Sequence, residues 1–309
     1  MVYGAFKKLV VADRISVFTD HIFSIEELSN YGGAMVVLGA LLRAFYLYCD
    51  FSGCMDMACG MSQALGIKLT ANFRRPFFST TVVEFWRRWH ITLGVWFKDY
   101  IYMPMVVNPH LIKLSGIFRK KLGKRAGKVV MTVIPLYAVW ILTGLWHGTG
   151  KGYIVWGFYY GTIIVFSTLF EPEIKKLTNI LRINTETTSW KVFQMIRTFL
   201  VFSFGRLLTV PHFRDQLKKI FFDNRPWQLF DGTLLNMGLD GANFAVMIIA
   251  LFIILFVSIA QEKGCVRERI ASYNIVFRWI LYLGAIFAVI IFGMYGPGFD
   301  ASNFVYMKF

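Results

Sequence analysis

The chain has 309 residues, of which 56% are hydrophobic and 17% are aromatic, and its mean hydropathy is +0.54. Only 17% are charged, against about 25% in soluble domains, and a soluble globule could not cover so much apolar surface. The composition therefore excludes a soluble globular protein, a disordered chain and a coiled coil. The class that remains is an integral membrane protein.

Basic residues outnumber acidic ones, 33 to 18, which gives a net charge of +15. In a soluble chain this excess would suggest nucleic-acid binding, but here the basic residues lie in short segments between apolar runs, as membrane topology places them. We expect membrane lipid, and no nucleic acid, as a partner. Three of the four cysteines, Cys49, Cys54 and Cys59, recur every five residues, which gives them no common helix face for a metal.

The first long apolar run, residues 31–66, follows a short amphipathic segment and contains Asp50. A carboxylate at this depth costs roughly 2.5 to 3.5 kcal/mol on insertion scales unless it is paired or hydrated. The simplest interpretation is a structural ion pair, with Arg43, Arg87 or Arg88 as the expected partner. A place along a substrate path, or direct catalysis, is the alternative.

Residues 76–107 are aromatic but carry too many charges to face lipid, which predicts interfacial or re-entrant helices buried in protein. Glu84 lies one turn before Arg87 and Arg88, a spacing that allows a local ion pair. His90 is either a hydrogen-bonded interior histidine or a functional one. A helix from about Thr81 would have one aromatic face, made of Trp86, Trp89, His90, Leu93, Trp96 and Phe97.

Four uncharged stretches are each long enough to cross a hydrocarbon core of about 30 Å as a helix. Another stretch, residues 192–213, is apolar but interrupted by two arginines. Together with residues 31–66, these stretches predict an all-α, polytopic membrane helix bundle. The four uncharged stretches are residues 129–150, 152–170, 241–261 and 279–299.

Residues 113–128 hold seven basic side chains and no acidic one, which predicts a loop on the cytoplasmic side. The next span then ends near His147, with a tight turn at 148–151 outside and residues 171–191 inside. His147 is surrounded by glycines, and imidazole can both accept and return a proton near neutral pH. A snorkelling histidine at a glycine-rich helix end is an equal alternative. The sequence lacks a GxSxG elbow, a P-loop, an HExxH motif and a dinucleotide fingerprint.

Four motifs carry a resemblance to a known family. They are CDFSGCMDMA at 49–58, NFRRPF at 72–77, EFWRRWHITLGVWFKDYIYMP at 84–104 and LTGLWHGTGKGYIVWG at 142–157. In this order they resemble the bacterial branch of the membrane-bound O-acyltransferases, and most closely the type that O-acetylates alginate. The aromatic C-terminus at 303–309 is similar as well, so the resemblance covers essentially the whole chain.

The resemblance implies a multi-helix membrane enzyme whose tunnel brings an acyl group from the cytoplasmic side to a hydroxyl. It implies no bound cofactor, with acetyl-CoA or another acyl thioester as the donor. By motif, His147 is the expected general base, and His90 is expected to orient the acyl group or stabilise the oxyanion. The expected substrate-binding residues are Asn72, Trp86, Arg87, Arg88, Asp50 and Trp146, and no metal site is implied.

The family further implies acetylation of an exported or cell-wall polysaccharide, directly or through an extracytoplasmic SGNH-type acetyltransferase or polymer-export partner, at the bacterial cytoplasmic membrane. D-alanyl transfer to teichoic acid and a non-enzymatic transport subunit are the alternatives. We expect residues 1–309 to form a single domain of this fold without the N-terminal spans of its relatives, and hence without a complete site. Departures from the family pattern at Cys49, Cys54, Met55 and 108–110 leave the polymer open.

Overall fold

The computed structural model describes residues 1–24 and 29–295, and in this part of the chain the secondary structure is helical, with one isolated β-bridge. The chain divides into two compact units, Met1–Ala71 with Pro211–Phe309, and Asn72–Val210, here called unit 1 and unit 2. The predicted all-α class is confirmed. Among the described residues, five helices are long and apolar enough to cross a membrane: α3 (Gly33–Ala64), α8 (Lys124–His147), α9 (Lys151–Leu169), α13 (Gly241–Glu262) and α15 (Ile275–Phe292).

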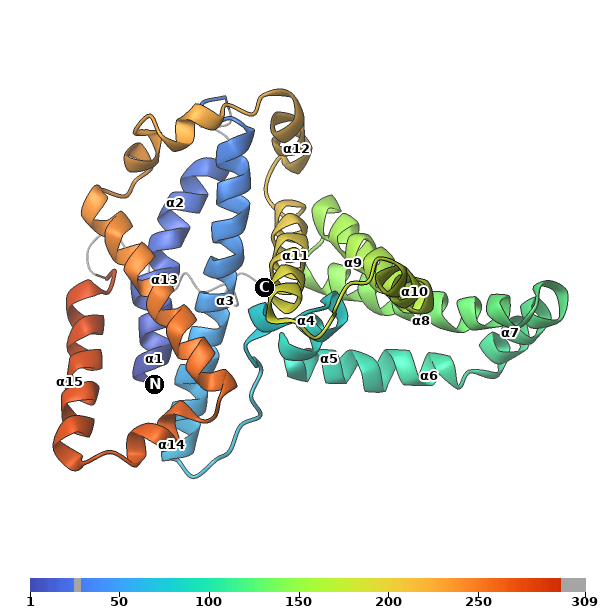
Figure 1. Cartoon of the computed structure of the whole chain (residues 1–309), viewed down its shortest axis with the longest axis horizontal. Coiled ribbons are helices and arrows are strands. Elements are labelled where there is room, and N and C mark those ends of the chain that lie inside the picture. The colour runs from blue at the N-terminus through green and yellow to red at the C-terminus, as the bar shows by residue number, and fades with distance from the viewer. Residues whose placement is uncertain (25–28, 296–309) are drawn as a thin grey trace. The chain divides into compact units, whose positions relative to one another are not determined.

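In unit 1 the N-terminal helical segments pack along the long helix α3 (Figure 1). The backbones approach closely where two glycines meet, because a Cβ on Gly4 would lie 2.5 Å from the carbonyl oxygen of Gly53. The middle segment is π-helical, an uncommon geometry that often marks a functional site. The three segments are α1 (Val2–Ala5), the π-helix η1 (Phe6–Ala12) and α2 (Asp13–Phe23).

The π-helix directs two consecutive lysines toward α3. Lys8 is 4% exposed, and its Nζ lies 2.6 Å from Asp50 Oδ1 and 2.8 Å from Asp13 Oδ1. Lys7 is buried beside it and reaches an oxygen of Asp56 at 2.8 Å. The prediction that Asp50 is ion-paired is confirmed. The predicted partner is wrong, because the lysine comes from a segment 42 residues away that the sequence pattern of α3 does not reveal.

Arg43, one of the expected partners of Asp50, pairs instead with Asp20 at 3.1 Å. Arg43 and Asp50 are seven residues apart on α3, about two helical turns, but Arg43 faces the C-terminal part of α2. A hydrogen bond to a nearer helix therefore takes the guanidinium away from Asp50.

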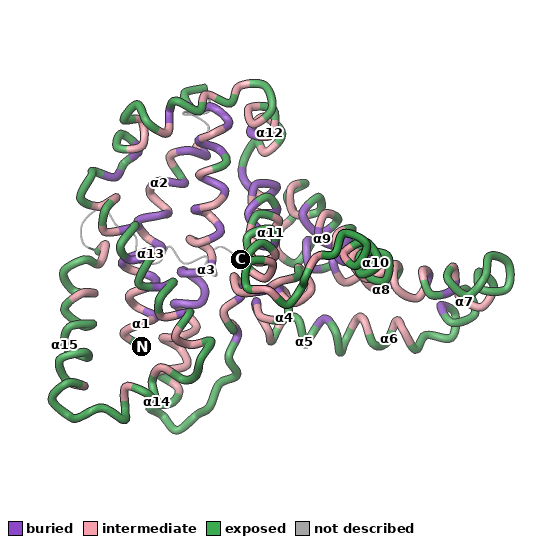
Figure 2. Tube along the Cα trace, viewed as in Figure 1, coloured by how far each residue is buried: buried purple, intermediate pink, exposed green. Residues whose placement is uncertain are grey.

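The C-terminal part of unit 1 returns to α3 through α12, whose Lys219 donates to the carbonyl oxygen of Tyr31 at 2.8 Å. Helix α15 is exposed along its length (Figure 2), as expected for an apolar helix surrounded by lipid. The predicted span at 279–299 extends beyond the described residues, and the C-terminal segment at 303–309 lies outside them. The further helices are α12 (Phe213–Phe222), η4 (Pro226–Leu229), η5 (Thr233–Asn236) and α14 (Val266–Ala271).

Unit 2 is built on the hairpin of α8 and α9, and the predicted tight turn between them is confirmed. Their backbones touch at Gly144, where a Cβ would lie 2.5 Å from the carbonyl oxygen of Tyr153, and again where Gly157 meets Trp140. Glycine at these two positions lets the helices pack closely and fixes their register. The remaining long helices of the unit are α7 (Pro109–Leu122), α10 (Glu171–Ile180) and α11 (Thr188–Leu207).

The basic segment at 113–128 is helical, so the expectation of a loop there is wrong. Helix α7 ends at Leu122, Gly123 adopts φ +91°, and α8 begins at Lys124. Lysine and arginine are good helix formers, and a single glycine with positive φ is enough to reverse the chain. The clustered charge predicted the location of the segment between two apolar runs but not its conformation.

Candidate active site

The aromatic residues around His90, which the sequence placed on one helix face, are not carried by one helix. Helix α4 (Val82–Arg88) and helix α5 (Ile91–Phe97) are separated by an extended Trp89 and by His90, whose φ of 46° and ψ of 53° are left-handed. The expectation of one continuous helix from Thr81 is therefore wrong. Only its start is confirmed, because the Thr81 hydroxyl caps α4 by accepting the backbone N–H of Glu84.

The break in the helix is stabilised by pairing with residues 72–74. The backbone N–H of Arg74 donates to the carbonyl oxygen of Arg88 at 2.9 Å, and that of Ile91 donates to the carbonyl oxygen of Asn72 at 3.0 Å. Phe73 and Trp89 form the isolated β-bridge between these bonds. Left-handed geometry is strained for a histidine and persists where the surroundings impose it, often at functional sites.

Asn72 also fixes the tautomer of His90. Its Oδ1 accepts the Thr92 backbone N–H at 3.1 Å and the Thr92 hydroxyl at 2.7 Å, so this atom is the amide oxygen. His90 Nδ1 lies 3.2 Å from the same oxygen and must carry a proton to bond to it. In the neutral ring the lone pair is therefore on Nε2.

Burial keeps His90 in this neutral form. Loss of solvent disfavours the imidazolium and lowers the pKa of His90 to about 4. Protonation would occur only well below neutral pH, so near pH 7 the ring presents Nε2 as a hydrogen-bond and proton acceptor. This is the state that a base or a substrate-orienting group requires.

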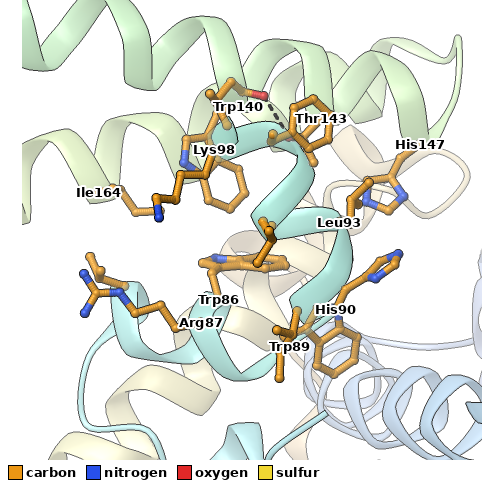
Figure 3. Close-up of a pocket in the computed structure, with 16 residues that line it drawn as sticks. Trp86, Arg87, Trp89, His90, Leu93, Lys98, Trp140, Thr143, His147 and Ile164 are labelled. Carbon is orange, nitrogen blue, oxygen red and sulfur yellow. Dashed lines mark hydrogen bonds between the residues drawn. The ribbon is translucent and has the colours of Figure 1, made fainter. Parts of the chain in front are cut away.

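His90 and His147 line the same pocket, which has a volume of about 340 Å³ and lies within unit 2 (Figure 3). One wall comes from α4 and α5. The other comes mainly from α8, where Trp140, Thr143 and His147 follow the i, i+3, i+7 spacing of one helix face. The pocket therefore joins two histidines that are 57 positions apart in the sequence.

The pocket is lined mainly by apolar and aromatic side chains, and Trp86 is central among them. Its ring meets Trp140 at 4.9 Å and Tyr160 at 4.8 Å between centroids, both in edge-to-face geometry. Buried aromatic pairs of this kind are rigid and exclude water. The lining residues include no aspartate or glutamate.

Two cations complete the pocket: Arg87 at the end of α4 and Lys98, the first residue of the π-helix η3 (Lys98–Tyr102). Figure 3 shows them on one side of the pocket and the two histidine rings on the other, with Trp86 between. Neither side chain has an ion pair or hydrogen bond with any residue at 1–24 or 29–295.

The other expected site residues lie outside the pocket lining. Arg88 pairs with Glu84 at 2.6 Å, which confirms the predicted local ion pair. Trp146 lies beside both histidines, tilted against His90 and edge-to-face with His147, at centroid distances of 6.1 Å and 4.9 Å. Asp50 belongs to unit 1, where it pairs with Lys8 as described. That these residues and the pocket's histidines bind or transform a substrate stays a prediction.

Sequence reasoning missed Lys98 and Thr143 as pocket residues. Thr143 could have been found, because it is four residues before His147 on one predicted helix. Eleven residues separate Arg87 from Lys98, which on one continuous helix would place both on the same face, but the break at His90 means that this spacing is not what brings them together.

The comparisons with known proteins give the family. The family model "MBOAT, membrane-bound O-acyltransferase family" matches residues 1–210, which include the pocket and both histidines. The chain belongs to the membrane-bound O-acyltransferase family. With its five apolar helices, it is a membrane protein.

Individual relatives fall into three groups by their names. The "Probable alginate O-acetylase AlgI" of Pseudomonas syringae pv. tomato is 32% identical over 80% of this chain and 42% of its own length. The "Peptidoglycan O-acetyltransferase" of Helicobacter pylori is 35% identical over 56% of this chain and 29% of its own length. The "Teichoic acid D-alanyltransferase" of Bacillus subtilis is 34% identical over 45% of this chain and 34% of its own length. The chain thus spans less than half the length of these relatives.

Proposed function

We propose that this chain carries the acyl-transfer centre of a polysaccharide O-acetyltransferase in the bacterial cytoplasmic membrane. The donor is a cytoplasmic acyl thioester such as acetyl-CoA, and the acceptor is a hydroxyl of an exported or cell-wall polysaccharide or of an extracytoplasmic partner acetyltransferase. The observation that carries the proposal is that His90 and His147 line one mostly apolar pocket in a chain of this family.

In the proposed reaction His147 takes the proton of the attacking hydroxyl. The oxygen forms a bond to the thioester carbonyl carbon, the carbon–sulfur bond breaks, and the proton passes from the imidazolium to the departing sulfur. His90, held neutral with its lone pair on Nε2, accepts a hydrogen bond from an O–H or N–H of a substrate and orients it. No covalent acyl-enzyme is required.

The pocket lining has no acidic residue, which favours acetyl over D-alanyl transfer. A D-alanyl group carries an ammonium, and a buried ammonium needs a carboxylate or several acceptors as partners. None of the residues that line the pocket is acidic, and two, Arg87 and Lys98, are basic. D-alanyl transfer to teichoic acid is the second candidate because of the similarity to the Bacillus subtilis protein. Growth on labelled acetate or labelled D-alanine, followed by analysis of the envelope polymer, separates the two.

Replacing His147 by Ala tests the chemistry. We expect acetyl transfer from labelled acetyl-CoA to polymer in isolated membranes to fall by about 10²- to 10⁴-fold, the usual contribution of a general base. The matched control is His110→Ala, which removes an exposed histidine of α7 and should leave the rate unchanged. Retained activity in His147→Ala, at equal amounts of inserted protein, would refute the assignment. Unchanged polymer acylation in both His147→Ala and His90→Ala would instead favour a transport subunit.

A further inference from the structure

Helix α7 and the first turns of α8 form a basic hairpin, residues 109–128, whose lysines and arginines are all exposed. We propose that the basic hairpin docks on the surface of the lipid bilayer, where its cations bind the phosphate groups of anionic phospholipids. None of its residues lines the histidine pocket. The inference is therefore independent of the proposed function and concerns how this segment meets the membrane.

The cations of the basic hairpin are almost all without a partner in the protein. Arg125 pairs with Glu173 of α10 at 2.6 Å. The other six have no ion pair or side-chain hydrogen bond in the part of the chain that the structure describes, and no acidic residue lies within 109–128. Clustered cations of this kind attract the negative headgroups of a bilayer surface. The six are Lys113, Arg119, Lys120, Lys121, Lys124 and Lys128.

Two of these cations, Lys124 and Lys128, lie where their own helix disfavours them. The N-terminal end of an α-helix carries partial positive charge, and the first turn of α8 has no acidic residue to offset it. A phosphate outside the chain would neutralise both the helix end and the lysines. Helix α8 is apolar and long enough to cross a membrane, and it begins at Lys124. We therefore expect its first turns to lie at the level of the headgroups.

Helix α7 has the pattern of a helix that lies in the membrane surface. It has 14 residues, about 21 Å, which is too short to cross a hydrocarbon core of about 30 Å. Its exposed apolar side chains Leu114, Ile117 and Phe118 follow the i, i+3, i+4 spacing of one helix face. Lys113 and Lys120, seven positions apart, lie beside this stripe. An apolar stripe bordered by lysines is the arrangement by which amphipathic helices bind anionic membranes.

Contacts between the two helices hold the basic hairpin together. The Ser115 hydroxyl donates to the carbonyl oxygen of Gly127 at 2.9 Å. A Cβ on Gly127 would lie 2.9 Å from the Cβ of Arg119, so glycine permits this close approach. Helix α7 is thereby fixed against the start of α8, where the span begins (Figure 1). The cations in the last turn of α7 thus lie beside those of α8, at one end of a membrane span.

The nature of the partner follows from the combination of charge and apolar surface. Helix α10 also exposes apolar side chains, such as Ile174 and Leu177, but its Lys175 is neutralised by Glu171 at 2.7 Å. The basic hairpin combines an exposed apolar stripe with unpaired cations. A bilayer of anionic lipid offers hydrocarbon and phosphate at the same surface, whereas a soluble partner recognised by charge leaves the stripe in water. An acidic soluble partner is the competing outcome of the test.

The test measures how lipid composition changes the exposure of α7. The purified full chain is placed in nanodiscs of phosphatidylcholine, with or without phosphatidylglycerol, and amide hydrogen exchange is followed by mass spectrometry. We expect the amides of residues 110–122 to exchange about tenfold more slowly when phosphatidylglycerol is present, because each lysine near an anionic surface contributes roughly a fivefold factor in binding. Raising the salt to about 0.5 M, which shortens the Debye length to roughly 4 Å, should remove most of this difference.

Matched variants locate the effect. Lys120→Gln combined with Lys121→Gln removes two unpaired charges from the basic hairpin and should abolish most of the difference between the two lipid compositions. Lys175→Gln combined with Lys176→Gln removes two exposed lysines of α10 in the same unit and should leave the difference unchanged. Ile117→Gln tests the apolar stripe and should speed exchange in both lipid compositions. All these substitutions are at exposed helical positions, so the core is unaffected.

Three outcomes would overturn the proposal. The first is equal exchange of α7 in the two lipid compositions. The second is an unchanged lipid effect in the variant with Lys120→Gln and Lys121→Gln, which would place the anionic lipid elsewhere on the chain. The third is that soluble poly-L-glutamate slows exchange of α7 and phosphatidylglycerol does not, which would assign the basic hairpin to an acidic soluble partner. Acetyl transfer is not measured in any arm, so none of these outcomes bears on the proposed function.

Discussion

The buried cluster around Lys8 in unit 1 and the pocket of unit 2 differ in whether carboxylates accompany their basic side chains. In unit 1 Lys8 is enclosed by Asp13 and Asp50; burial disfavours its ammonium, but the two carboxylates outweigh this and raise the pKa of Lys8. In the pocket of unit 2 Arg87 and Lys98 have no carboxylate opposite them, and His90 is neutral. A cation whose partner is supplied by the protein stabilises the fold, whereas a cation without one is available to a ligand.

The buried cluster of unit 1 gives the largest expected effect. Replacing Lys8 by Met leaves Asp50, which is 1% exposed, without its cation, and should destabilise the protein by about 3 to 5 kcal/mol. Thermal unfolding in detergent measures this loss, and Asp50→Asn in the same background should restore part of it. An unchanged melting temperature for Lys8→Met would show that the cluster is hydrated, and the contrast between the units would disappear.

The second prediction gives His90 a carboxylate partner, as Lys8 has in unit 1. Asn72→Asp is nearly isosteric and places a carboxylate against His90 Nδ1, which should raise the pKa of His90 from about 4 by roughly one to three units. Transfer requires neutral His90, so activity is lost as the pH falls through this pKa. The acid limb of the pH–rate profile should move upward in the variant. A profile identical to that of the unmodified chain would remove His90 from the reaction.

A third, smaller effect concerns the ion pair beside the pocket. Glu84 is half-buried; burial raises its pKa, but hydrogen bonds from Thr80 and the ion pair with Arg88 outweigh this and lower it. Its stabilising contribution is present at neutral pH and is lost as the pH falls below 4.5. Glu84→Gln should cost about 1 kcal/mol at pH 7 and less near pH 3, as measured by thermal unfolding at both values. Equal losses at both values would contradict it.

The smallest effect is expected on the surface of unit 2. Lys175 and Glu171 form an ion pair 2.7 Å long one helical turn apart, and both side chains are exposed. Lys175→Met should change stability by less than about 0.5 kcal/mol, because solvent screens the pair. Lys175→Met and Lys8→Met both replace a lysine by methionine, so the two melting temperatures compare the loss of an exposed ion pair with the loss of a buried one. A loss as large as that of Lys8→Met would mean that burial does not determine how much an ion pair stabilises this protein.

Local sequence patterns predicted much of this structure. The length of the apolar runs predicted the membrane spans, and the glycines after His147 predicted the turn before α9. The spacing of Glu84 and Arg88 predicted their ion pair. These features depend on residues within one or two helical turns, so periodicity and composition reveal them.

Features that depend on distant residues were not predictable in the same way. The partner of Asp50 comes from the N-terminal π-helix, and the break at His90 exists because Asn72 pairs with residues beyond it. The aromatic periodicity through 86–97 fits one helix as well as two. Lys98 reaches the pocket after the chain turns at His90, so its place there does not follow from its eleven-residue spacing to Arg87, although a continuous helix would also put the two on one face.

The bond from His90 to Asn72 has a direction, and that direction limits the chemistry of the ring. A neutral His90 with its proton committed at Nδ1 can receive a hydrogen bond at Nε2 but has none to give, so it cannot stabilise the negative oxygen that forms on a thioester carbonyl. That charge needs a donor from elsewhere, such as a backbone N–H or a cation. Asn72, which would touch no substrate in this scheme, thereby limits His90 to accepting a hydrogen bond or a proton from the substrate.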